Sequence, residues 1–439
     1  MQAILKTGRN IAIAMAHAIL LPAAVHSQQP QRLPERDTEL QLRFESVFTV
    51  GKEEGADNEV FSQIPSITFD AASNLYVLDR DNARVLVFGK DGRFVRQIGK
   101  QGEGPGEFRI PAAVAPLDGG RIAVYDMAGR NISVFTPDGR YESLIRITEP
   151  VGAFPQMRTF ARGGVLLTGT QMSASPGQPP TVSDSLPILW QAATDDAPTR
   201  ALVRVPSVPP VVNASGSQNN REVRVTPPPV FSPIVSWSAL PDGRLAVSSS
   251  TDWRIQIFSP EGRPGTVLER PIRARAVSER DRQRAREQRR ANLESGAGGV
   301  RVENVNGRER MTVGGGGQGI PPEQIERILA SLQFAETVPV ISGVRADPEG
   351  RIWIQREGGP GQERGPIDLI APDGHYIGTI RGEALPDAFG PDGLVAWIQS
   401  DELGVQRVAV SRVTGIPVGN AGREERPSTF PGQDAPSND

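Results

Sequence analysis

The chain repeats one pattern of strands and tight turns at a fixed spacing, and this repeat constrains the fold more than any other feature. Segment 75–92 recurs 47 residues later as 122–139, and its core returns at 241–262 and 348–374. Repeats of about 20–50 residues indicate solenoids, propellers or similar arrays, in which each unit packs against its neighbours. The fold is therefore expected to be built from several copies of one small unit.

Each copy consists of short strands joined by two-residue turns. In the first copy, the apolar strand 75–78 precedes a second apolar strand, 85–88, and the turn Asp91-Gly92 follows. Asp-Gly supplies the positive φ values that two-residue hairpins require. The unit is thus a four-stranded antiparallel meander of about 45 residues, which is the size of a propeller blade.

The first copy resembles a known repeat family. The run Asn74-Leu-Tyr-Val-Leu-Asp79, followed by Asn-Ala-Arg-Val-Leu-Val-Phe88 and a glycine-rich tail at 99–106, closely resembles the NHL repeats of exported bacterial six-bladed propellers. The resemblance implies an all-β fold, a six-bladed β-propeller with four-stranded antiparallel blades, and a role as an interaction platform. Blades are expected at 60–108, 109–152, 153–206, 230–272, 337–381 and 382–413, with seven blades as the alternative.

The ends of the chain carry separate signals. Lys6 and Arg9 precede the apolar stretch 11–25, which predicts a signal peptide over 1–27. No cysteine is present, which excludes disulfides and a lipoprotein anchor. We expect a flexible N-terminus at 28–41, the propeller at 42–413 and a disordered tail at 414–439. The protein would be a monomer, periplasmic or secreted, that does not span the membrane.

Segment 42–50 alternates apolar and polar residues and has no partner strand of its own. We expect it to complete the last blade, because closure of the ring removes open sheet edges.

Three segments depart from the repeat. Segments 171–186 and 206–229 are polar and are predicted to be long loops. Residues 273–336 are predicted to form a helical insertion between blades 4 and 5, with a flexible glycine-rich stretch at 296–319. Its first helix is rich in arginine, which indicates either a docking surface for an acidic partner or a solvated helix whose charges partly cancel. The candidate docking residues are Arg280, Arg284, Arg286 and Arg290.

Histidine is too scarce for much of the common site chemistry. Of three histidines, His17 and His26 fall in the predicted signal peptide, and His375 follows a hairpin turn. Ser-His-Asp hydrolysis and multi-histidine metal sites need a histidine in a pocket. We therefore expect no catalytic residue and no cofactor. The formal net charge of −3 gives no indication of a nucleic-acid partner.

Acidic residues at the ends of the second strands leave two interpretations open. Residues such as Asp79 and Asp126 either converge on a divalent cation, as the resemblance to sugar lactonases suggests, or bond nearby backbone amides in turns. Their recurrence at equivalent positions favours the turns, so we expect no metal site. The candidate ligand-binding residues on the same face are Arg80, Asp81, Arg130, Asp252 and Trp253.

Taken together, these features predict an exported, non-catalytic β-propeller that binds or scaffolds a protein or glycan in the envelope or outside the cell. The alternative is a metal-dependent, lactonase-like hydrolase that uses carboxylates at the mouth of the channel.

Overall fold

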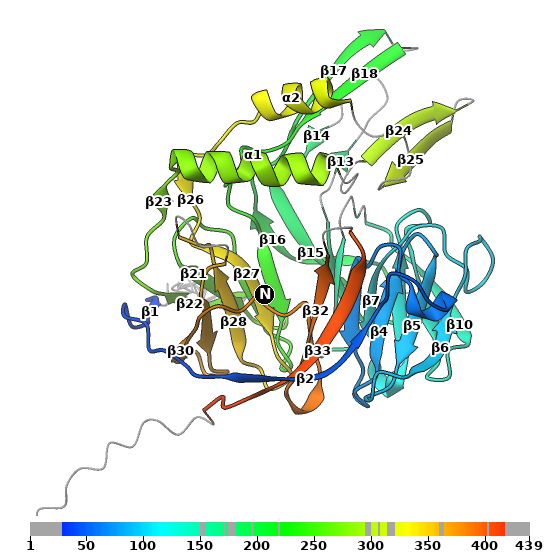
Figure 1. Ribbon diagram of the computed structural model, residues 1–439, viewed down its shortest axis with the longest axis horizontal. Helices are drawn as coiled ribbons and strands as arrows, with labels where there is room; N and C mark the ends of the chain where they lie inside the picture. Colours follow the sequence, from blue (N-terminus) through cyan, green and yellow to red (C-terminus); the bar gives the residue numbers. More distant parts are fainter. Residues whose placement is uncertain are drawn as a thin grey trace, which may run out of the picture.

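In a computed structural model of the chain, six antiparallel sheets stand around one axis, and the protein is a six-bladed β-propeller (Figure 1). The structure describes residues 29–417 except 150, 152–154, 170–171, 174–180, 195–196, 218–219, 295–299, 306–307, 314–320, 360–363 and 402–403. The predicted signal peptide and most of the predicted C-terminal tail lie outside the described residues.

Blades 1 to 5 each have four strands from one meander, and blade 6 has three strands from its meander and one from the N-terminal part of the chain. The first strand of each meander is the innermost. The innermost strands contact one another around the axis, as β3 contacts β7 and β31. Blades 1 to 3 contain β3 (Ser66–Phe69), β4 (Leu75–Asp79), β5 (Arg84–Phe88) and β6 (Phe94–Ile98); β7 (Pro111–Pro116), β8 (Ile122–Asp126), β9 (Asn131–Phe135) and β10 (Tyr141–Arg146); and β11 (Gln156–Thr159), β12 (Val165–Thr168), β15 (Ser185–Gln191) and β16 (Arg200–Pro206).

Blades 4 to 6 follow the same plan. They contain β19 (Ser236–Ala239), β20 (Leu245–Ser248), β21 (Arg254–Phe258) and β22 (Pro264–Glu269); β27 (Ile341–Ala346), β28 (Ile352–Arg356), β29 (Ile367–Ile370) and β30 (Tyr376–Ile380); and β31 (Ala388–Phe389), β32 (Leu394–Ser400), β33 (Gln406–Thr414) and β2 (Arg43–Val50). Three single-turn 3₁₀ helices lie in connections: η1 (Asp57–Glu59), η2 (Asp118–Gly120) and η3 (Pro391–Gly393). The predicted boundaries of blades 1 to 5 enclose their strands, whereas in blade 6 β33 ends at Thr414, one residue past the predicted boundary.

The ring is closed by strands from both ends of the chain. Strand β2 pairs antiparallel with β33, from Arg43 opposite Thr414 to Val50 opposite Val408. The prediction that the N-terminal strand completes the last blade is confirmed. Apolar residues fill the spaces between blades, and the large side chains of Trp237 and Trp353 are fully buried there. Burial of this apolar surface holds neighbouring blades together.

The prediction of a flexible N-terminus at 28–41 is wrong for the segment that the structure describes. Strand β1 (Gln31–Arg32) pairs parallel with β22 at the outer edge of blade 4. The buried guanidinium of Arg270 donates hydrogen bonds to the carbonyl oxygens of residues 34–36 and pairs with Asp37 and Asp368. These long-range contacts fix a segment whose own composition favours disorder.

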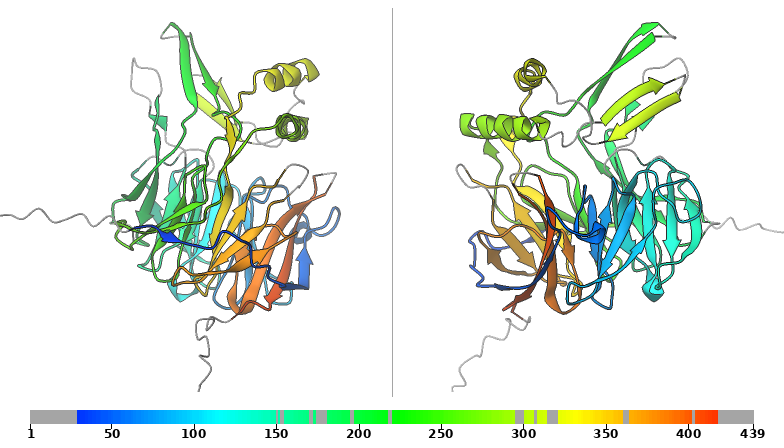
Figure 2. Two further views of the ribbon diagram at one scale, coloured as in Figure 1. Left: turned by 90° about the vertical axis from the view of Figure 1, so that its left-hand side faces the viewer. Right: turned by 45° about the vertical axis from the view of Figure 1, so that its right-hand side comes forward.

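All the long connections stand on one face of the ring, above the propeller in Figures 1 and 2. The insertion between blades 4 and 5 contains both predicted helices. Its elements are β23 (Arg275–Ala276), α1 (Glu279–Glu294), β24 (Val300–Val305), β25 (Arg308–Val313), α2 (Pro322–Ala330) and β26 (Thr337–Val338). No helix in the described part of the chain is long and apolar enough to cross a membrane.

Two predictions about these connections need correction. Segment 206–229, predicted as a polar loop, holds the hairpin of β17 (Val211–Ser217) and β18 (Asn220–Thr226), and β13 (Met172–Ser173) pairs with β14 (Thr181–Val182). The glycine-rich stretch 296–319 holds the β24–β25 hairpin. In one strand of each hairpin, β18 and β24, valines alternate with polar residues, which is a strand pattern that the surrounding polar and glycine-rich composition obscures.

Candidate ligand site in the central channel

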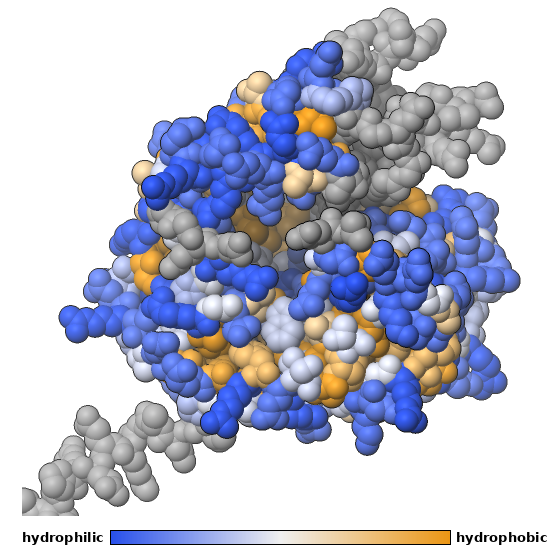
Figure 3. Space-filling view, viewed as in Figure 1, coloured by the Kyte–Doolittle hydropathy of each residue, from blue (hydrophilic) through white to orange (hydrophobic). Residues whose placement is uncertain are grey.

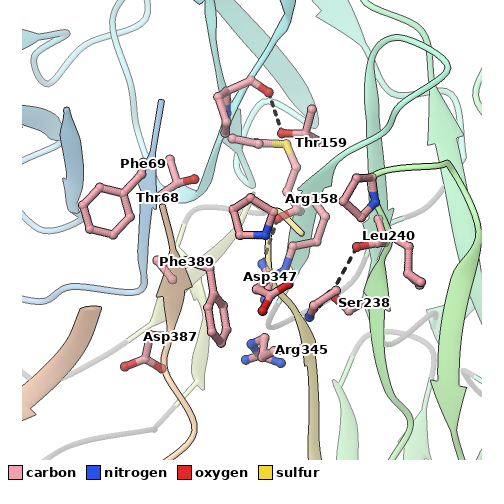
Figure 4. Close-up of a pocket in the computed structure, with 18 of the residues that line it drawn as sticks. Thr68, Phe69, Arg158, Thr159, Ser238, Leu240, Arg345, Asp347, Asp387 and Phe389 are labelled. Atoms are coloured by element: carbon pink, nitrogen blue, oxygen red, sulfur yellow. Dashed lines mark hydrogen bonds between the residues drawn. The ribbon is translucent and has the colours of Figure 1, made fainter. Parts of the chain in front are cut away.

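The innermost strands of all six blades enclose a cavity of about 350 Å³ on the axis of the ring (Figure 4). Its wall includes Ala161, Pro241 and Pro348, which lie in the turns that follow three of these strands. Strand β27 starts beside the insertion and runs away from it, since β26 directly precedes it in the chain. The cavity therefore lies toward the face of the ring opposite the insertion.

Equivalent residues of the six inner strands can be aligned by the turn that ends each strand. In each blade, a backbone N–H at this turn donates to the carbonyl four residues later, as from Phe160 to Gly164 and from Asp347 to Arg351. The position two residues before this N–H is small in four blades and arginine in two. The six residues are Thr68, Ala115, Arg158, Ser238, Arg345 and Ala388.

Both arginines line the cavity, and neither has a carboxylate partner in the described part of the chain. Arg158 donates from Nη1 to the carbonyl of Met157 at 2.9 Å. Arg345 donates in the same way to the carbonyl of Val344 at 3.0 Å, and its buried Nε has no hydrogen-bond partner. Most of the donor capacity of two guanidinium groups is thus directed into the channel.

Asp387 is the acidic residue whose charge affects the pKa of both arginines. Its Oδ2 accepts a hydrogen bond from the backbone N–H of Ile398 at 2.8 Å. The Asp387 side chain is exposed, but the protein packed around it still raises the pKa of its carboxyl group, although the N–H of Ile398 and the charges of Arg345 and Arg158 lower that pKa. The three charges influence one another across the channel without forming an ion pair.

Burial raises the pKa of an acid such as Asp387, but it lowers the pKa of the two arginines. Burial and, to a smaller extent, the nearby charge of Arg345 lower the pKa of Arg158 to about 9, although the charge of Asp387 partly opposes both. Burial also lowers the pKa of Arg345. A lowered guanidinium pKa means that the charged form is poorly solvated where it stands. The site therefore holds positive charge at a cost to stability.

Three other polar side chains of the cavity are engaged in hydrogen bonds within or between blades. Thr159 donates its hydroxyl hydrogen to the carbonyl of Pro116 at 2.6 Å, across the boundary of blades 2 and 3. Ser238 accepts from the backbone N–H of Ala346 at 2.9 Å. Asp347 accepts from the side chains of Arg351 and Trp353. Arg158, Arg345 and Asp387 remain as charged groups with capacity for a ligand.

The repeated aspartates serve the turns, as their recurrence predicted. Asp79 is fully buried and accepts from Ser62, Asn82 and Arg84. Asp126 accepts from the four backbone N–H groups of residues 109, 110, 128 and 129. Among the described residues, no three His, Cys, Asp or Glu side chains are grouped so that they could hold a metal ion. Asp79 and Asp126, two of the carboxylates considered for the hydrolase alternative, are thus engaged in hydrogen bonds.

The predicted ligand-binding residues are distributed over three blades. Arg80 pairs with its neighbour Asp81 at 3.6 Å in blade 1, and Arg130 occupies a left-handed turn position in blade 2. In blade 4, Asp252 pairs with Arg273, while Trp253 is buried and donates its indole N–H to Asp368. No hydrogen bond or ion pair between described residues brings these three groups together.

The arginines predicted to dock a partner lie on α1, whose surface is hydrophilic in Figure 3. Three of the four are engaged within the insertion: Arg284 pairs with Asp281, Arg286 with Glu279 and Arg290 with Glu326 on α2. Arg280 is exposed. Much of the charge of this helix is thus balanced inside the insertion.

The insertion is fixed to the propeller at the start of α1. Ser278 and Asp281 form reciprocal hydrogen bonds, which is a capping arrangement that starts the helix. Asp281 is fully buried and also accepts two hydrogen bonds from Arg275, at 2.6 and 2.9 Å. Arg275 in turn donates to the carbonyl of Gly358 in blade 5. His375, by contrast, is half exposed in its turn beside Asp373, as predicted.

One match to a known family agrees with the architecture. A sequence profile of a family described as 6-bladed beta-propeller (DUF5128) matches residues 54–115. No curated protein matches the chain. A putative exported protein from Bacteroides fragilis is 11% identical over 87% of this chain and 99% of its own, with a TM-score of 0.42. A gluconolactonase from Xanthomonas campestris is 13% identical over 84% and 86%, with a TM-score of 0.39. Similarity at this level says nothing of function.

Proposed function

We propose that the chain is an exported, non-catalytic β-propeller that acts as a binding module and takes a small anionic ligand in its central channel. The ligand is either free or a group on a protein or glycan of the envelope or the cell exterior. The observation that carries the proposal is the pair of guanidinium groups, Arg158 and Arg345, which line the cavity without a carboxylate partner in the described chain.

A binding role explains why arginine stands at these two positions. A poorly solvated charge destabilises the folded protein unless a partner compensates it. A guanidinium presents several donors in a fixed plane, which suits carboxylate, sulfate or phosphate groups. An anionic ligand would supply the missing partner, whereas the small residues at the four equivalent positions leave room for it.

The chemistry of the cavity supports binding more than catalysis. Nucleophilic catalysis needs a hydroxyl or thiol within reach of a base. The hydroxyl groups of Thr159 and Ser238 instead bond backbone atoms. Thr68 also lines the cavity, but none of the described residues that line it is a histidine that could act as its base. The basic residues and apolar stretch at the start of the sequence support export.

The test is a thermal-shift and calorimetric panel of small anions on the mature chain, at constant ionic strength because surface charges also respond to salt. The double variant Arg158→Met/Arg345→Met is compared with Arg162→Met, which removes an exposed arginine that pairs with Glu261 on the propeller surface. We expect saturable binding of at least one anion, lost in the double variant and retained in the control. Absence of any saturable binding, or binding that the double variant keeps, would contradict the proposal.

A further inference from the structure

We infer that the channel ligand is a monoanionic sugar acid, a single carboxylate on a polyhydroxylated ring. This inference rests on the proposed function and narrows it to one ligand class. Three features of the cavity support it: the balance of its charges, a carboxyl group that faces the same space as the arginines, and apolar side chains in the wall.

The balance of charges favours a ligand with one negative charge. Arg158 and Arg345 contribute two positive charges, and Asp387 lies close enough to influence the pKa of both. A dianion such as sulfate would face the repulsion of Asp387 in a partly desolvated channel, where charge interactions are stronger than in water. A monoanion bound to the arginines would be repelled less strongly by Asp387 than a dianion would.

Asp387 also offers a partner for hydroxyl groups. Among the described residues, its Oδ2 accepts from the N–H of Ile398 and its Oδ1 has no hydrogen-bond partner, so Oδ1 is available to a ligand. A carboxylate accepts hydrogen bonds from hydroxyl groups, and a protonated carboxyl donates as well. A ligand with both a carboxylate and hydroxyl groups would thus satisfy the arginines at one end and Asp387 at the other.

The wall of the cavity provides one flat apolar surface for a ring, the side chain of Phe389. Phe389 lies beside Arg345 in Figure 4 and is partly exposed, whereas Phe69 and Leu240 are buried in the cores between blades. The ring of Phe389 packs against Trp353 with centroids 5.2 Å apart, which holds it in place. The aromatic face carries partial negative charge and suits the C–H groups of a sugar ring. A cavity of about 350 Å³ is at the small end of ligand sites, so it suits one small molecule.

The experiment compares four probes by calorimetry on the full mature chain: D-glucuronate, D-glucose, acetate and sulfate. We expect glucuronate to bind at least about tenfold more tightly than each of the others, because only it combines one carboxylate with hydroxyl groups. Arg158→Met/Arg345→Met should abolish glucuronate binding, and Arg162→Met should leave it unchanged. In Asp387→Asn, the preference for glucuronate over sulfate should fall about tenfold, since the repelling charge is removed.

Two failures are distinguishable. If acetate or sulfate binds as tightly as glucuronate, or if Asp387→Asn leaves the preference unchanged, the sugar-acid inference is overturned while anion binding in the channel stands. If no anion binds, or if glucose binds as tightly as glucuronate, the proposed function fails with it. A disaccharide that ends in glucuronate distinguishes the sources: binding at least as tight as the monomer indicates the end of a glycan, and binding of the monomer alone indicates a free sugar acid.

Discussion

Replacement of one channel arginine should stabilise the protein, which is the reverse of what a structural arginine would do. The change is Arg158→Met, which keeps the length and most of the volume of the side chain and removes its charge. In the folded protein, burial and the charge of Arg345 lower the pKa of Arg158 from its ordinary 12.5 to about 9. The folded state therefore holds this charge less favourably than the unfolded chain does.

The size of the effect follows from this pKa. Each tenfold change in ionisation corresponds to about 1.4 kcal/mol, so the lowered pKa sets an upper limit of about 5 kcal/mol on the cost of the charge. Arg158 keeps partial contact with solvent in the channel, and water screens much of that cost. The variant also loses one hydrogen bond to Met157, worth about 1 kcal/mol. We expect a net stabilisation of about 1–2 kcal/mol at pH 7.

Chemical denaturation of the ligand-free protein measures this difference, and its dependence on pH gives the sign. The folded protein releases the Arg158 proton at a lower pH than the unfolded chain does, so wild-type stability rises relative to the variant once the pH passes above the lowered pKa of the folded state. The advantage of the variant should be full at pH 7–8 and smaller at pH 10–11. Arg162→Met, the exposed control, should change stability by less than about 0.5 kcal/mol. Destabilisation of 1 kcal/mol or more by Arg158→Met would refute the reasoning.

Three further predictions concern the structural network. Asp281→Asn should weaken the attachment of the insertion, because it removes a buried charge paired with Arg275; proteolysis within 273–336 should become faster, and an unchanged rate would contradict the assignment. Arg270→Met should cost about 3–5 kcal/mol in denaturation, since Asp368 is left buried and the N-terminal segment loses its donor. Asp126→Ala should cost about 2–4 kcal/mol through four unpaired amides, whereas the exposed Asp138→Ala should be nearly neutral, and equal effects would count against the turn role.

The architecture could be predicted because it depends on local patterns in the sequence. Strands of blades 1 and 2 recur at one interval with the same turn residues, so their pairing can be inferred from local chemistry. The lone strand β2 implied closure, because an unpaired edge in an otherwise repeated array needs a partner. The helices of the insertion have strong local propensities and a proline at the start of α2. Each of these predictions depends on short-range patterns.

The contacts that could not be predicted join distant parts of the chain. Arg270 fixes residues 34–37 from more than 200 positions away, and nothing in the composition of the N-terminal segment indicates this. The channel site has a similar origin, since Arg158 and Arg345 come from different blades. The sequence did contain one indication of the channel site. Alignment of the inner strands by their turns shows arginine at two of six positions that are otherwise small, which marks a departure from the repeat that core packing does not require.

The central claim, that the channel arginines form an anion site, is tested most directly by crystals of the mature protein soaked in bromide. Bromide scatters anomalously, and its positions can be compared between wild type and Arg158→Met/Arg345→Met in the same crystal form. We predict an anomalous peak on the axis of the ring, within contact distance of both guanidinium groups in the wild type and absent in the double variant. A channel without a peak in the wild type, with bromide only on the outer surface, would contradict the claim.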